Sequence, residues 1–76
     1  MFVIIRADEK EMTFVSTVDT SEEANKVIYD ELLEIYGGDT DRMNDDIEDN
    51  EAEICDSDMF AWSNRKGNHV IKAFWV

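Results

Sequence analysis

Residues 19–38 read DTSEEANKVIYDELLEIYGG, and this stretch predicts the longest regular element of the chain. Thr20 suits a helix N-cap, and Glu23, three residues later, completes a capping box. Gly37 and Gly38 supply a stop signal. The apolar residues that recur at helical spacing are Ala24, Val27, Ile28, Leu32 and Ile35. We therefore predict an amphipathic helix over 20–36.

Short segments rich in β-branched and aromatic residues lie on both sides of this helix. FVIIRA (2–7) and TFVSTV (13–18) precede it, and DMFAWS (58–63) and HVIKAFWV (69–76) follow it. Each pair is joined by a short polar connection, which is typical of a β-hairpin. Residues 2–7 are apolar on both faces, which favours a central strand. The prediction is one α+β domain over 1–76, with a four-stranded antiparallel sheet of two hairpins and the main helix packed on one face.

The stretch 39–58, DTDRMNDDIEDNEAEICDSD, carries ten of the nineteen acids of the chain and one base, Arg42. Met43 and Ile47 lie four residues apart, which is enough to attach one or two helical turns to the core. Whether residues 39–50 form a short acidic helix or a loop stays open at this stage. Residues 52–55 are apolar enough to begin a strand. The apolar residues within this stretch indicate a folded surface studded with carboxylates.

Charge limits the classes of partner. The chain has a net charge of −12, and only its last 18 residues, which hold three bases and no acid, are positive. Such a field repels nucleic acid and anionic lipid and attracts a basic protein groove. No apolar run approaches the roughly 20 residues of a membrane span. The opening MFVIIRA lacks the features of a secretory signal and Cys55 is the single cysteine, so we expect a cytoplasmic protein.

Metal and catalytic motifs fail on their spacing. A calcium loop needs an oxygen ligand at position 5 and a glutamate at about position 12. Counting from Asp39 puts Met43 at position 5, and counting from Asn44 puts Cys55 at position 12. Zinc has only Cys55 and His69 as soft ligands, without close-spaced companions. We predict no metal, no cofactor and no enzymatic activity.

The order of motifs carries a resemblance. VDTSEEA opens a helix, an acidic middle follows, and FAWSN leads to a final strand that contains tryptophan. This order resembles small proteins of bacteria, their phages and mobile elements, whose very acidic members include anti-CRISPR inhibitors and other DNA mimics. The resemblance implies a stoichiometric inhibitor of a nuclease or effector complex. It transfers no functional residue.

The acidic surface is therefore the candidate binding site. Carboxylates at i,i+4 on a helix or i,i+2 on a strand lie ~6–7 Å apart, near the spacing of phosphates along one nucleic-acid strand. We expect a non-enzymatic inhibitor of a nucleic-acid-binding host defence complex that occupies its basic groove. The residues expected to bind the partner are Asp45, Asp46, Glu48, Asp49, Glu51 and Glu53, with Asp30 and Glu34 of the main helix in support.

A different class of function stays open. Phe74 and Trp75 are adjacent on a predicted strand, so their side chains point to opposite faces of the sheet. Most of the aromatic side chains near the C-terminus, which also include Phe60 and Trp62, are expected in the core. If the helix covers one face, however, one aromatic remains outside, where it suits an interface. The alternative is a small homodimerising interaction or assembly module whose acidic surface only solubilises it.

Overall fold

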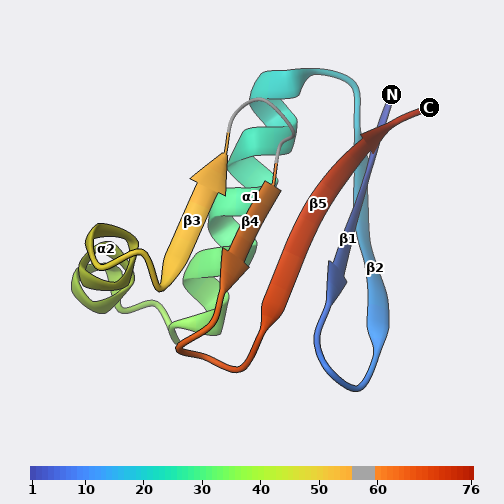
Figure 1. Cartoon of the computed structure of the whole chain (residues 1–76). Coiled ribbons are helices and arrows are strands. Elements are labelled where there is room, and N and C mark those ends of the chain that lie inside the picture. The colour runs from blue at the N-terminus through green and yellow to red at the C-terminus, as the bar shows by residue number, and fades with distance from the viewer. Residues whose placement is uncertain (56–59) are drawn as a thin grey trace.

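A computed structural model describes residues 1–55 and 60–76. It is an α+β fold in which a helix lies against one face of an antiparallel sheet (Figure 1). This confirms the predicted class. The elements are β1 (Phe2–Ala7), β2 (Met12–Val18), α1 (Ser21–Ile35), α2 (Thr40–Glu48), β3 (Ala52–Cys55), β4 (Phe60–Ser63) and β5 (His69–Trp75).

The sheet has five strands in the order β2-β1-β5-β4-β3, so the prediction of four strands was wrong by one. The additional strand is β3, which is only four residues long and pairs antiparallel with β4 from Ala52–Ser63 to Cys55–Phe60. An isolated four-residue segment is a weak strand signal, and β3 is stabilised by its neighbour. The two predicted hairpins are present, and β1 is central, between β2 and β5. The predicted start of the third strand, at 58, lies outside the described residues.

Local signals set both ends of α1. The Thr20 hydroxyl accepts a hydrogen bond from the Glu23 backbone N–H at 3.2 Å, as the N-cap prediction requires. At the other end, the Gly38 N–H donates to the Leu33 carbonyl at 3.0 Å and the Gly37 N–H donates to the Glu34 carbonyl at 2.9 Å. Both glycines have positive φ, which completes a Schellman C-cap. The chain therefore turns sharply after Tyr36 and enters α2.

The core lies between α1 and one face of the sheet. α1 contacts β1, β2, β4 and β5 (Figure 1). Its buried residues recur every four positions, which is the spacing of one helical face. The buried apolar residues are Ile4, Ala24, Ile28, Leu32, Tyr36, Met43, Ala52, Ala61, Ile71 and Ala73. Several of them are alanines, and these small side chains let the helix approach the sheet closely.

Residues 39–50, left open between helix and loop, contain the nine-residue helix α2. Met43 is fully buried and Ile47 packs partly against the core, so the predicted attachment by these two residues is confirmed. α2 contacts α1 and β3. The acidic stretch is therefore ordered against the body of the protein over the part that the structure describes.

Candidate functional site

Acidic residues lie at both ends of helix α2. Its N-cap is Asp39, whose Oδ1 accepts a hydrogen bond from the Arg42 N–H at 3.0 Å, and Asp41 lies in the first turn. Acids there interact favourably with the helix dipole. The last turn, however, contains no base, and Glu48 and the C-cap Asp49 place negative charge at the negative end of the dipole. Local helix preferences therefore do not account for the acids at the C-terminal end of α2.

One of the predicted binding residues is not on the surface. Asp46 is only 1% exposed, and its Oδ1 accepts a hydrogen bond from Arg65 Nη1 at 2.9 Å. Beside this pair, the hydroxyls of Tyr36 and Ser63 are hydrogen-bonded at 2.9 Å. The expectation that Asp46 contacts a partner directly is therefore not supported. The helical turn that buries Met43 carries Asp46 inward as well, because the two residues are three positions apart.

The Asp46–Arg65 pair attaches α2 to the connection between β4 and β5. Arg65 Nη1 also lies 3.9 Å from the Asp49 carboxylate, so one guanidinium partly compensates two acids. The Tyr36 hydroxyl lies in the same region, and burial together with the nearby Asp46 carboxylate raises its pKa above the ordinary value. These contacts hold α2 in a fixed orientation, which positions its outward carboxylates.

The other predicted acids differ in their exposure and in the side chains that they contact. Asp45, Glu48 and Asp49 are exposed on α2, and Asp30 is exposed on α1. Glu34 is exposed but lies 3.6 Å from Arg6. Glu51 is half-buried. Glu53, on β3, is exposed, but its carboxylate already accepts a hydrogen bond from Trp62 Nε1 at 2.9 Å. The candidates therefore do not form one continuous set, and α2 holds the densest group.

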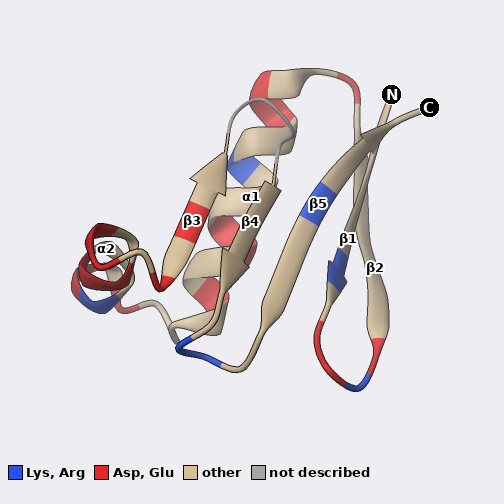
Figure 2. Ribbon diagram, in the orientation of Figure 1, with Lys and Arg blue, Asp and Glu red and all other residues tan. Residues whose placement is uncertain are grey.

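Sequence reasoning did not select Asp39 and Asp41, which border a hollow on α2 of about 450 Å³ together with Asp45, Arg42 and Arg65. Asp41 precedes Asp45 by four residues, and this helical spacing could have identified Asp41 as a neighbour of Asp45 on the same face. Figure 2 shows the acidic segments gathered on the helices and the β1–β2 connection, whereas the strands are mostly uncharged. Within 1–55 and 60–76, no group of three or more His, Cys, Asp or Glu side chains is arranged to hold a metal ion.

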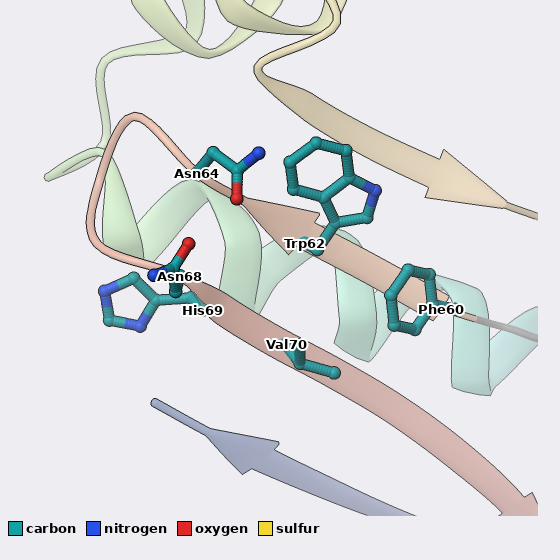
Figure 3. A pocket seen from close by; sticks show the side chains of 6 residues that line it. All are labelled: Phe60, Trp62, Asn64, Asn68, His69 and Val70. Carbon is teal, nitrogen blue, oxygen red and sulfur yellow. The ribbon is translucent and has the colours of Figure 1, made fainter. Parts of the chain in front are cut away.

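A second surface lies on the sheet face opposite α1. Phe60, Trp62 and Val70 project from β4 and β5 on this face and border a shallow depression of about 360 Å³ (Figure 3). Phe74 lies on the same face and is 44% exposed. The expectation that most of these aromatics are core residues is therefore wrong. On β4 the residues that face α1 are Ala61 and Ser63, and the aromatics alternate with them outward.

No family model, curated protein or solved structure matches the chain. None of the helices in the described residues is long and apolar enough to cross a membrane. The fold and its surfaces define a small acidic α+β protein with two distinct faces. One is helical and rich in carboxylates, and the other is an open apolar sheet.

Proposed function

We propose that the protein is a non-enzymatic inhibitor that binds the basic groove of a nucleic-acid-binding protein with the carboxylates of α2. The observation that supports this most directly is the exposed row of Asp41, Asp45 and Glu48 along α2. At 1.5 Å rise per residue the three are separated by about 6 and 4.5 Å along the helix axis, comparable to successive phosphates. Lys and Arg side chains that bind a phosphate backbone would donate charge-assisted hydrogen bonds to these carboxylates in the same way.

Rigidity of the helix favours this function over simple solubilisation. Met43 is buried and Asp46 is paired with Arg65, so α2 is fixed to the body at two points on its inner side. A rigid row of charges loses less conformational entropy on binding than a free acidic loop does. The energetically unfavourable acids at the C-terminal end of α2 are also explained if a basic partner compensates them in the complex.

The class of partner proposed for this acidic surface is a nuclease or effector complex in the cytoplasm of a bacterial host. An anti-CRISPR inhibitor is the specific form of this proposal. It also follows that the protein does not bind DNA or RNA itself, because its net charge of −12 repels both.

The test compares two variants with equal charge. One carries Asp41→Asn, Asp45→Asn and Glu48→Gln on α2, and the other carries three neutral substitutions of exposed acids elsewhere: Glu11→Gln, Asp19→Asn and Glu22→Gln. Wild type and both variants are used as bait in a bacterial lysate at low and high salt. We expect the wild type and the control to recover a basic nucleic-acid-binding protein at low salt, and the α2 variant to lose it.

Competition with nucleic acid completes this test. The recovered protein should release bound DNA or RNA when the wild type is added, and high salt should weaken the inhibition because exposed charges are screened over ~8–10 Å. If the α2 variant inhibits as well as the wild type, the acidic helix is not the binding surface.

The open sheet face favours a second candidate, an assembly module whose acids only solubilise it. In that case the recovery of a partner would not change with either set of neutral substitutions. The two functions differ in whether the α2 carboxylates contribute to binding, and the variants above separate them.

A further inference from the structure

The uncovered face of the sheet carries three of the four phenylalanines and one of the two tryptophans of the chain. By strand register and alternation, this face consists of Val3, Ile5, Ala7, Met12, Phe14, Thr17, Glu53, Cys55, Phe60, Trp62, Val70, Lys72 and Phe74. Phe14 is 63% exposed and Met12 is 70% exposed. A small domain gains most stability by burying such residues, yet the core uses alanine and serine at the alternating positions of β4. The placement of the aromatics is therefore not explained by the folding of a single chain.

Two charges of opposite sign lie on either side of β4, the second strand from one edge of the sheet. Glu53 on β3 pairs in register with Trp62 on β4, and Lys72 on β5 pairs with Phe60 on β4. Phe60 and Trp62 are two residues apart and point to the same side. The midpoint between Glu53 and Lys72 therefore lies on β4, between the two aromatic side chains. Among the residues assigned to this face, Glu53 and Lys72 are the only charged ones.

We propose that the occupant of this face is a second copy of the chain, related by a two-fold axis that lies in the interface and passes between Phe60 and Trp62. An axis perpendicular to the line from Glu53 to Lys72 places Glu53 of each chain opposite Lys72 of the partner subunit. The two sheets then pack face to face, about 10 Å apart. Two equivalent ion pairs form around a central cluster of aromatic side chains.

Charge identifies a copy of the chain as the occupant. One acid and one base placed symmetrically about β4 make the face complementary to itself, which a patch of a single sign is not. Two chains of charge −12 repel each other, and among the described residues assigned to this face Glu53 is the single acid. Asp41, Asp45 and Glu48 of α2 are not among the residues of this face. The inference therefore does not depend on the function proposed for α2.

The experiment measures the association of the full chain by sedimentation velocity over a range of concentrations and salt. We expect a monomer–dimer equilibrium that tightens with added salt, because screening reduces the repulsion between the two acidic chains. Binding of α2 to a basic groove has the opposite salt dependence. Val70→Asp places a carboxylate near the centre of the face, where Val70 is 38% exposed, and should abolish the dimer. The substitution disfavours the strand on a scale of about 1 kcal/mol, so circular dichroism must show that the variant monomer keeps its fold.

A charge swap tests the axis itself. Glu53→Lys and Lys72→Glu alone each place like charges opposite each other, and each should raise the dissociation constant more than about tenfold. The double variant Glu53→Lys/Lys72→Glu restores opposite charges and should return the constant to within about threefold of the wild type. Lys10→Glu, in the β1–β2 connection, is the control and should have little effect.

Three results would overturn the proposal. A wild type that sediments as a monomer at all concentrations excludes the second copy, including the case in which this face binds a different protein. A dimer that is unaffected by Val70→Asp and by both single charge reversals has its interface elsewhere. If the single reversals weaken the dimer and the double variant does not restore it, the two-fold axis does not pass between Phe60 and Trp62.

Discussion

The two faces of one sheet use side-chain size in opposite ways. Along β4, Ala61 and Ser63 are buried under α1, while Phe60 and Trp62 alternate with them toward the open side. Along β5, Ile71 and Ala73 are buried on the covered face and Phe74 is exposed on the open face. Trp75, at the end of β5 on the covered side, is also exposed and packs edge-on against Phe2, so both adjacent aromatics are accessible. The covered face is built for close approach of a helix, whereas the open face offers large apolar area. This difference indicates that the covered face provides the stability of the chain and the open face provides a surface for association.

Truncating one residue on each face gives the largest expected contrast. Leu32 is fully buried against the covered face, so Leu32→Ala should lower the free energy of unfolding by about 2–5 kcal/mol. Phe14 is opposite Ile5 on the open face, and Phe14→Ala should cost only about 0.5–1 kcal/mol. Urea unfolding at a concentration too low for association measures both. Equal losses would show that the open face contributes to the monomer's stability as much as the core does.

The next contrast separates the buried acid of α2 from its exposed surroundings. Arg65→Ala leaves the buried Asp46 carboxylate without its ion-pair partner. We expect a loss of about 2 kcal/mol, below the 3–5 kcal/mol of a fully buried pair, because Arg65 is partly exposed. Arg42→Ala, on the exposed side of α2, should change stability by less than about 0.5 kcal/mol. Urea unfolding distinguishes the two, and similar values would mean that the Asp46–Arg65 pair does not anchor the helix.

A smaller effect is expected at Tyr36, with a defined pH dependence. Its pKa is raised in the folded state, so the protonated hydroxyl is favoured there. The resulting stability is fully present below the unfolded pKa of about 10 and is lost as pH rises through the folded pKa. Tyr36→Phe should cost about 1 kcal/mol at neutral pH, since Ser63 loses the hydrogen bond with the Tyr36 hydroxyl and keeps only that from the Lys66 N–H.

The pH profile of Tyr36→Phe identifies the titrating group. Above about pH 10 the variant should lose stability less steeply than the wild type, because it has no hydroxyl to ionise there. Tyr29→Phe, which removes an exposed tyrosine hydroxyl from α1, is the matched control substitution. Thermal unfolding between neutral and alkaline pH measures all three proteins. A Tyr36→Phe profile parallel to that of the wild type would assign the alkaline loss to other groups.

The smallest expected effects compare the two ends of α2. Glu48→Gln removes a negative charge at the C-terminal end and should raise stability by about 0.3–1 kcal/mol. Asp41→Asn removes one from the first turn and should lower stability by a similar amount. Opposite signs, measured at low ionic strength, would show that the dipole governs the cost of these acids. The acids at the C-terminal end would then be retained at the expense of stability.

Much of the fold follows from short segments of sequence. The limits of α1 come from Thr20 and from Gly37 and Gly38, and each of these signals acts within about five residues of chain. The positions of the hairpin strands follow from alternation and composition in the same local way. Residues 52–55 carried a local strand signal, but β3 was not counted in the predicted sheet because four residues do not indicate which strand they pair with.

The tertiary structure decided which face of each element is buried. Alternation along β4 places Phe60 and Trp62 on one side and Ala61 and Ser63 on the other, but it does not say which side α1 covers. That choice depends on the closer packing that the small side chains allow against Ala24, Ile28 and Leu32 of the helix. Likewise, the sequence alone gives Asp45 and Asp46 the same character. Only the contact of α2 with the body, which brings Arg65 from 19 residues further along the chain, makes one a buried ion pair and leaves the other in solvent.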